Sequence, residues 1–375
     1  MQDVVIAAYR RSPFTFARKG DLARVRPDDM AATVIRALVA ESGINPADIE
    51  DVIVGCAFPE GEQGFNVARL ISFLAGLPIS AAGVTVNRFC GSSMQSVHQA
   101  AGAIAMGAGD AFICAGIESM SRVPLGGFNP MPNPGLIEIL PAAYISMGDT
   151  AENVARRYQI SRSAQEAFAV TSHQKAAAAQ AAGKLEAEIV AIGHVTQDGC
   201  IRPDTNAEAL AGLKPAFSAD GTVTAGTSSP LTDGASAVLV CSADYARSHG
   251  MKPLARVKSI AVCGCGPEVM GMGPVGSSQK AMKRAGITTA DLDIVEINEA
   301  FASQALACMR ELGIREEIAN IDGGALALGH PLGATGARIL GKAASLLARE
   351  GGRHALVTQC IGGGQGIATV LEGIA

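Results

Sequence analysis

The stretch VNRFCGSSMQS, residues 86–96, places a cysteine where a strand-like run meets the start of a helix. β-Branched residues precede Cys90, and the small residues after it lead into an Ala-rich segment that predicts a helix over 96–106. At a helix N-terminus, unpaired backbone N–H groups and the positive end of the dipole stabilise a thiolate over a thiol. Cys90 is therefore the leading candidate nucleophile. On this segment alone, the competing interpretation is a small buried hydrophobic residue, the usual fate of a free cysteine.

The composition around this stretch is that of a packed α/β enzyme. The chain has 375 residues, 48% of them hydrophobic and 17% charged, with 44 glycines, and this length suits two or three domains. A net charge of −5 gives no overall cationic field for nucleic acid or an anionic membrane. The nine cysteines are scattered and odd in number, which favours reduced thiols in a cytoplasmic compartment over a disulfide framework.

Two further classes of feature are not expected. The N-terminus resembles a first strand rather than a signal peptide, and no uninterrupted apolar run reaches the roughly 18 residues that a membrane span needs. Cys263 and Cys265 form a CGC without a CxxC motif or a histidine pair, so no metal site is predicted.

Strands and helices alternate before and after Cys90. Short apolar runs predict strands over 4–8, 51–56 and 111–115, and helical spacing predicts helices over 27–41 and near 66–74. This succession favours an α/β layered fold. The basic loop 10–26 is expected to carry solvated charge, although it could also meet an anion or a partner subunit.

The pattern changes after residue 116. Prolines and glycines dominate 116–150, helices are predicted over 150–158 and 164–183 with Ser163 as a cap, and a polar loop over 225–234 precedes a strand over 235–240. We therefore expect an inserted loop domain over 117–234. The N-terminal half then comprises 1–116 plus 235–250, and a C-terminal half covers 251–375.

The C-terminal half repeats the first plan. DLDIVEINEAF at 291–301 mirrors EDVIVGCAF at 50–58, and a strand over 354–358 runs into Cys360 as 84–86 runs into Cys90. Two similar halves packed about a pseudo-dyad would bring these strand ends together, where α/β sheets place ligand sites. The similarity is weak residue by residue, so an accidental match is the alternative.

Glycine-rich stretches supply the rest of the candidate chemistry. GGALALGHPLGATGAR (323–338) and CIGGGQG (360–366) contain no phosphate-loop pattern. Among six histidines, His330 alone lies in such a loop, where it can be the base that a cysteine nucleophile needs or a structural residue. Asn298, in NEAFA, can orient a water or donate to an oxyanion. A nucleophile and a separate thiol acid/base suit carbon–carbon bond chemistry α to a thioester.

NRFCGSSMQ, NEAFA, GGALALGHPLGATGAR and CIGGGQG, in this order, resemble the thiolase family over essentially the whole chain. The resemblance implies a five-layered αβαβα core of two related halves with an inserted loop domain, assembled as a homodimer or homotetramer. It also implies coenzyme A as co-substrate, with no permanently bound cofactor.

Site roles follow from the same resemblance. Cys90 is the acylated nucleophile, His330 its activator, and Cys360 the acid/base at the acetyl-CoA carbanion. One oxyanion hole is formed by His330 and a water on Asn298, and the other by the N–H groups of Cys90 and Gly362. The list of site residues is completed by Ser229 at the pantetheine arm and Met147 in the acyl pocket.

Departures from the family pattern guide the choice of subtype. Asp322 stands where Asn is common, and Ser146 stands where acetoacetyl-CoA-forming members often carry His, while EQGFNVAR (62–69) resembles degradative members. We expect a 3-ketoacyl-CoA thiolase of the β-oxidation type. Such an enzyme can also associate with other β-oxidation enzymes. The alternatives are a biosynthetic acetyl-CoA acetyltransferase, a ketoacyl synthase, and a catalytically silent acyl-CoA-binding or lipid-binding relative.

Overall fold

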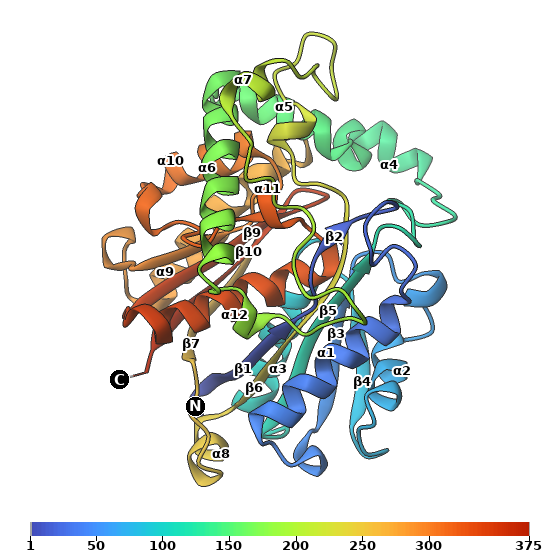
Figure 1. Cartoon of the computed structure of the whole chain (residues 1–375), viewed down its shortest axis with the longest axis vertical. Coiled ribbons are helices and arrows are strands. Elements are labelled where there is room, and N and C mark those ends of the chain that lie inside the picture. Colours follow the sequence, from blue (N-terminus) through green and yellow to red (C-terminus); the bar gives the residue numbers. More distant parts are fainter. Residues whose placement is uncertain (1, 375) are drawn as a thin grey trace.

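The computed structural model describes residues 2–374 and is built on one long mixed sheet. Ten strands lie in the order β4-β3-β5-β6-β1-β7-β10-β9-β8, with β2 beside β6 (Figure 1). The strands are β1 (Val4–Arg11), β2 (Thr15–Phe16), β3 (Asp51–Cys56), β4 (Ala82–Val86), β5 (Ala111–Ser119), β6 (Thr232–Ser242), β7 (Ala255–Gly264), β8 (Ile294–Ile297), β9 (His354–Ile361) and β10 (Gln365–Gly373).

Three hydrophobic cores divide the molecule into five layers. One core joins the first half of the sheet to α1 (Pro27–Ser42), α2 (Val67–Leu74) and α8 (Ala243–Ser248). The middle core lies between the two halves of the sheet and contains α3 (Ser92–Ala105) and α12 (Leu332–Glu350). The third joins the second half to α9 (Gly273–Ala285) and α10 (Ala302–Leu312). The five-layered αβαβα prediction is confirmed.

Small residues make the middle layer possible. A Cβ added to Gly116 of β5 would lie 2.1 Å from the Gly333 carbonyl oxygen, and one added to Gly336 would lie 2.3 Å from the Met94 nitrogen. Because a real Cβ cannot approach backbone so closely, α12 reaches its packing distance from β5 and from α3 only with glycine at these positions.

The two halves share one topology, but the predicted strand equivalence is partly wrong. β3 and β8 each pair in parallel with a neighbour, β5 and β9 respectively, and each neighbour continues into antiparallel partners. The counterpart of β9, which carries Cys360, is therefore β5 rather than β4. The predicted equivalence of 84–86 and 354–358 was wrong, because a short apolar run before a cysteine does not show which strands it pairs with in the sheet.

Two local predictions also need correction. The cap of α6 (Arg162–Ala181) is Ser161, whose side chain accepts the Ala164 N–H, rather than Ser163. Arg11 is not a solvated loop charge, because β1 extends to it and its side chain is fully buried. It donates to Asp198 at 2.7 and 2.8 Å and to Glu188 at 2.9 Å, carboxylates that only the folded chain brings near.

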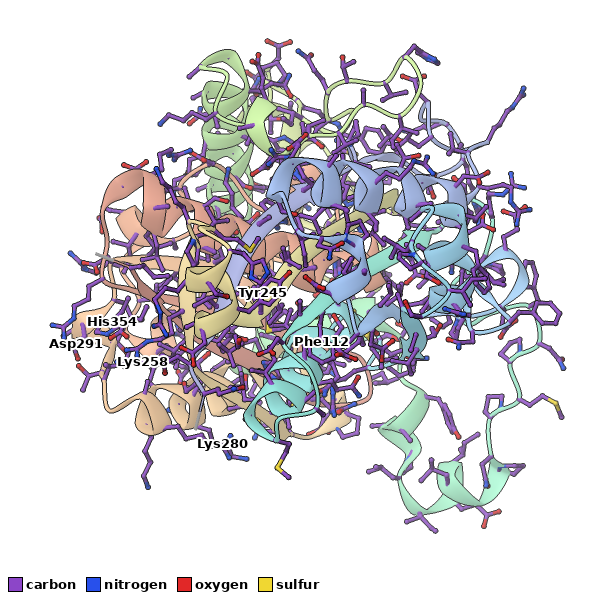
Figure 2. All side chains as sticks on the ribbon, turned by 90° about the horizontal axis from the view of Figure 1, so that it is seen from below. Phe112, Tyr245, Lys258, Lys280, Asp291 and His354 are labelled. Carbon is purple, nitrogen blue, oxygen red and sulfur yellow. The ribbon has the colours of Figure 1, made fainter. Side chains whose placement is uncertain are left out.

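The segment between β5 and β6 crosses one end of the molecule. α5 (Met147–Arg157), α6 and α7 (Ala207–Ala211) lie together there, while α4 (Pro134–Ile139) projects sideways (Figure 1). Figure 2 shows the α4 segment standing clear of the body, and Met131 and Ile139 within it are each 82% exposed. Among residues 2–374, no helix has both the length and the apolar character to cross a membrane.

Candidate active site

Cys90 lies in a tight turn between β4 and α3. Gly91 caps the helix, and Phe89 before the cysteine has a φ of 43°, a left-handed conformation that is uncommon for a side chain of this size. The Phe89 N–H donates to the Asn87 side chain at 2.8 Å, and the Gln359 side chain donates to the Cys90 carbonyl. The turn is therefore fixed both within its own half and to β9 of the other half.

The expectation of a stabilised Cys90 thiolate is not met in this state of the protein. Burial raises the pKa of Cys90 to about 11, although a backbone hydrogen bond from Gly362 opposes this increase. Cys90 is only 9% exposed, so loss of hydration outweighs the field at the start of the helix. The thiol is neutral at physiological pH and needs a base.

His330 has the geometry of a neutral base. Its Nδ1 lies 2.6 Å from the Thr335 hydroxyl, which itself donates to the Pro331 carbonyl at 3.0 Å. The hydroxyl proton is thus occupied, so we assign the His330 proton to Nδ1, which leaves Nε2 unprotonated and able to act as an acceptor. Burial, with a smaller effect of Arg338, lowers the pKa of His330 to about 3, which keeps the imidazole neutral.

Asn298 comes next to this base at the end of β8. Its side-chain Nδ2 lies 3.3 Å from His330 Nε2. Its backbone N–H donates to the Thr358 carbonyl at 3.0 Å. The side chain is fully buried, and its Oδ1 has no hydrogen-bond partner within residues 2–374. An unpaired buried acceptor is costly, so this oxygen is well suited to holding a water or a substrate group.

Cys360 lies near the end of β9 in an apolar environment. It is 1% exposed and packs in a cluster with Ala300, Phe301 and Met270, against which Met147 also packs. Burial raises the pKa of Cys360 well above its ordinary value, and the neighbouring Cys90 adds to the increase. The structure thus brings the two cysteines close enough to interact electrostatically.

The remaining predicted residues lie around these groups. A Cβ on Gly362 would be 3.5 Å from Met147 Sδ and 3.7 Å from the Phe89 ring, so Gly362 separates Met147 from the turn of the nucleophile. Ser229 lies against the NEAFA segment, since its N–H donates to the Ala300 carbonyl at 2.9 Å. The contacts therefore form two groups, Cys90–Gly362–Cys360 and Asn298–His330, and the Asn298–Thr358 hydrogen bond joins them through β9.

Sequence reasoning missed three supporting residues. Thr335 follows His330 by five residues in a string that was already singled out, and a hydroxyl so close to the histidine in sequence is a usable signal. Gln359 directly precedes Cys360. Glu118 was passed over because the predicted strand stopped at residue 115, whereas β5 runs to Ser119.

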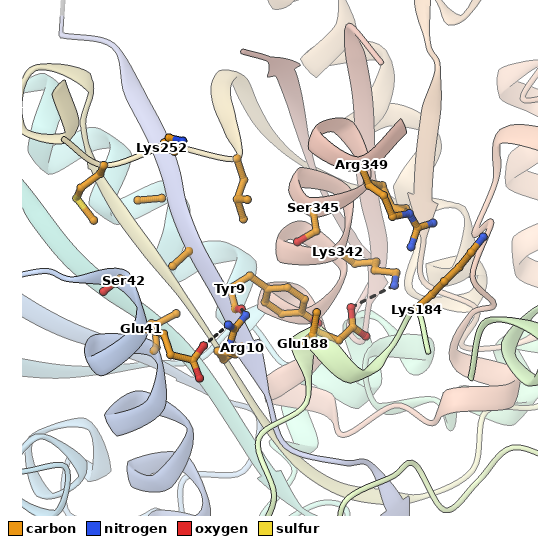
Figure 3. A pocket seen from close by; sticks show the side chains of 17 residues that line it. Tyr9, Arg10, Glu41, Ser42, Lys184, Glu188, Lys252, Lys342, Ser345 and Arg349 are labelled. Atoms are coloured by element: carbon orange, nitrogen blue, oxygen red, sulfur yellow. Dashed lines mark hydrogen bonds and ion pairs between the residues drawn. The ribbon is translucent and has the colours of Figure 1, made fainter. Parts of the chain in front are cut away.

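A cavity of about 520 Å³ lies elsewhere, among β1, α1 and α12 (Figure 3). None of the predicted site residues lines it. Its buried Lys342 is paired with Glu188 at 3.1 Å and with Asp322 at 2.8 Å, and Asp322 also pairs with Arg349 at 2.8 Å. These four charges are paired with one another, and Asp322 therefore holds cations of α12 rather than contacting the predicted site residues.

Comparison with known proteins agrees with this geometry. The family model described as thiolase, N-terminal domain, matches residues 4–244, and the one described as thiolase, C-terminal domain, matches residues 251–373. A 3-ketoacyl-CoA thiolase of Bacillus subtilis is 47% identical over 390 residues, covering 99% of this chain and 100% of that protein.

Other relatives are similar to the same extent. A 3-ketoacyl-CoA thiolase of Shewanella denitrificans is 48% identical over 386 residues, covering 99% of this chain and all of the relative. One of Erwinia tasmaniensis is 46% identical over 388 residues, with both chains covered completely. With both family models matched and relatives aligned from end to end, the chain belongs to the thiolase family.

Proposed function

We propose that this protein is a 3-ketoacyl-CoA thiolase, an acyltransferase that uses coenzyme A to cleave a 3-ketoacyl-CoA into acetyl-CoA and a shortened acyl-CoA. The observation that carries the proposal is the pair of buried, mutually close thiols, Cys90 and Cys360, in a fold that also holds a neutral histidine, His330, whose unprotonated Nε2 lies 3.3 Å from the Asn298 amide. The names of the relatives support the same activity. Coenzyme A is a co-substrate, and no permanently bound cofactor enters the reaction.

The first half-reaction transfers the acyl group to Cys90. His330 Nε2 takes the Cys90 proton, and the thiolate attacks the 3-keto carbon. The bond between C2 and C3 then breaks, and Cys360 protonates the acetyl-CoA carbanion. The products are acetyl-CoA and an acyl-Cys90 thioester.

The second half-reaction transfers the acyl group to coenzyme A. The proton that His330 took from Cys90 first passes to the Cys360 thiolate, which leaves His330 neutral again. His330 then takes the proton of the coenzyme A thiol as the sulfur attacks the thioester, and it gives this proton to the Cys90 thiolate as that group leaves, so both cysteines end protonated and the balance closes. N–H groups of Cys90 and Gly362 stabilise one oxyanion, and His330 with a water on Asn298 stabilises the other.

Substrate binding is assigned to residues between the two halves. Met147 lines the acyl pocket beside Gly362, and Ser229 contacts the pantetheine arm next to the NEAFA segment. Both lie in the loop domain over 117–234, while 1–116 plus 235–250 and 251–375 form the two catalytic halves. The contact of Met147 with the Cys360 cluster supports this assignment.

The molecule is proposed to act as a homo-oligomer in the cytoplasm. β4 is the end strand of the sheet, and apolar residues near it are open to solvent, with Phe65 93% and Ile79 80% exposed. An apolar sheet edge of this kind is a natural contact for a second copy, giving a dimer or a dimer of dimers. All nine cysteines are free thiols, which supports a reducing compartment.

The proposal is tested by measuring thiolysis of acetoacetyl-CoA and longer 3-ketoacyl-CoAs with coenzyme A. A rate that holds or rises with chain length is expected, whereas activity confined to acetoacetyl-CoA would indicate an acetyl-CoA acetyltransferase. Cys90→Ser should abolish acyl transfer while the unfolding transition is retained. Wild-type turnover by that variant would refute the nucleophile.

A further inference from the structure

Glu118 is a buried carboxylate that the reaction scheme does not use. It is 1% exposed and lies next to last in β5, at the carboxyl end of the strand. Its counterpart in the other half is Cys360. In the first half, Gly55 of β3 pairs with Gly116 of β5, and Glu118 follows two residues later. In the second half, Ile297 of β8 pairs with Thr358 of β9, and Cys360 follows two residues later. Glu118 and Cys360 each lie opposite a glycine on the next strand.

One oxygen of Glu118 joins the two halves of the site. Oε2 accepts the Ala57 N–H at 2.8 Å and the Gly333 N–H at 2.9 Å. Gly333 lies in the first turn of α12, whose cap residue makes no side-chain hydrogen bond to the free N–H groups of that turn. A carboxylate at this position satisfies one of those groups and lies at the positive end of the helix dipole.

Each side of this contact leads to a reacting residue. Gly333 follows His330 by three residues, and a Cβ on it would lie 2.4 Å from the Ile117 carbonyl oxygen, so this segment has little room to shift. On the other side, the Ala57 carbonyl accepts from the Asn87 side chain at 3.0 Å. Asn87 in turn accepts the Phe89 N–H at 2.8 Å, directly before Cys90.

The hydrogen-bond pattern favours an ionised Glu118, although burial raises the pKa of this carboxyl. Its other oxygen, Oε1, accepts the Gln63 side-chain amide at 2.9 Å and the Phe58 N–H at 3.4 Å. The Cys56 thiol also faces the carboxylate, with its Sγ 3.8 Å from Oε1. The orientation of Gln63 is fixed, because its own oxygen accepts the Ser119 N–H at 2.6 Å. All these partners are donors, so a proton on Glu118 would have no acceptor, and the carboxylate form is the satisfied one.

We propose that Glu118 is a positioning residue for the thiolase reaction, whose carboxylate holds the Cys90 turn and the His330 loop in register across the two halves. It touches neither substrate nor reacting atoms. The inference rests on the proposed function, since it assigns Glu118 to the geometry of the Cys90–His330 pair.

The test compares wild type with Glu118→Gln, which is nearly the same size but replaces one acceptor oxygen by a donor. If the new NH₂ group takes the place of Oε2, the N–H groups of Ala57 and Gly333 lose their shared acceptor, and the Cys90 turn and the His330 loop are no longer held at a fixed distance. A misplacement of about 1 Å costs on the order of 100-fold, so kcat is expected to fall by about 10- to 100-fold while the KM for coenzyme A stays constant.

A second readout separates this role from simple stabilisation of the fold. Burial is the main cause of the raised Cys90 pKa, but the Glu118 charge adds to it. Alkylation of Cys90 by iodoacetamide, followed on its peptide by mass spectrometry, should therefore move to lower pH in Glu118→Gln. A residue that only stabilised the fold, with its charge far from Cys90, would leave that pH profile unchanged.

A control that shares the backbone contacts but lies at an exposed carboxylate is Asp293→Asn. The Asp293 carboxylate also accepts two backbone N–H groups, from Arg353 at 2.7 Å and His354 at 3.1 Å, but at the start of β9, away from the site. We expect some loss of stability with kcat and the alkylation profile unchanged. An equal fall of kcat in this control, or wild-type kcat in folded Glu118→Gln, would overturn the proposal.

Asn87→Ala keeps the test decisive if Glu118→Gln does not fold. This variant removes the hydrogen bonds that link Ala57 to Phe89 through the Asn87 side chain, but it keeps the Glu118 charge. We therefore expect kcat to fall while the alkylation of Cys90 keeps its wild-type pH dependence. Wild-type kcat in Asn87→Ala would overturn the inference. Failure of the proposed function is distinguishable, because it would appear as an absence of thiolysis by the wild-type protein, whatever happens at Glu118.

Discussion

Replacing Thr335 by valine tests whether the orientation of His330 matters for the reaction. Thr335 is fully buried, and its hydroxyl accepts the His330 Nδ1–H at 2.6 Å. Valine has nearly the same shape but no acceptor. The imidazole N–H then loses its partner, and the tautomer with the proton on Nε2, which cannot accept the Cys90 proton, becomes competitive.

The magnitude follows from the cost of that lost contact. A buried donor without a partner costs about 1–3 kcal/mol. If the transition state for Cys90 acylation carries this cost, the acylation rate falls by roughly 5- to 150-fold, since about 1.4 kcal/mol is tenfold. The assay is single-turnover formation of the acyl-enzyme from a 3-ketoacyl-CoA in the absence of coenzyme A.

Two controls make the result interpretable. Thr335→Ser keeps a hydroxyl and should recover most of the acylation rate. Thr369→Val removes a hydroxyl 2.9 Å from Nε2 of another buried histidine, His98, outside the site, and should lower stability without slowing acylation. The reasoning would be refuted by an acylation rate within about twofold of wild type in Thr335→Val, or by an equal loss in Thr369→Val.

Three further outcomes are expected. Cys360→Ala should slow exchange of the acetyl-CoA α-protons, measured by deuterium incorporation, far more than acyl-enzyme formation; an equal effect on both would contradict a separate acid/base. Gly333→Ala should lower the free energy of unfolding by about 1–3 kcal/mol in urea, because its Cβ would lie 2.4 Å from the Ile117 carbonyl oxygen, and unchanged stability would disprove that packing. Asp322→Asn should destabilise by about 1–3 kcal/mol at pH 7, because Lys342 then keeps only Glu188, and Arg349 only Glu350, as a carboxylate partner. Ion pairing lowers the Asp322 pKa against the effect of burial, so the wild-type advantage should be present at neutral pH and disappear as the pH falls through that pKa; an advantage that persists in acid would contradict it.

The sequence by itself determined several of the elements and predicted the candidate reactive groups. The run 51–56 is a strand with the predicted bounds, because a short apolar run between a charged and a small residue is a local pattern. The strings around Cys90, His330 and Cys360 were equally readable, because each carries its residue type and its glycines within a few positions.

Only the tertiary structure decided the electrostatics and the equivalence of the halves. The position of Cys90 at the start of a helix predicted a stabilised thiolate. In the folded protein, burial of Cys90 raises its pKa instead. Arg11 is not solvated, because it pairs with Asp198, which lies 187 residues away in the chain. The equivalence of β9 and β5 is recognised only from the strands that each pairs with in the sheet. Local patterns record propensity and spacing, whereas hydration, charge pairing and strand order depend on which distant segments the fold brings together.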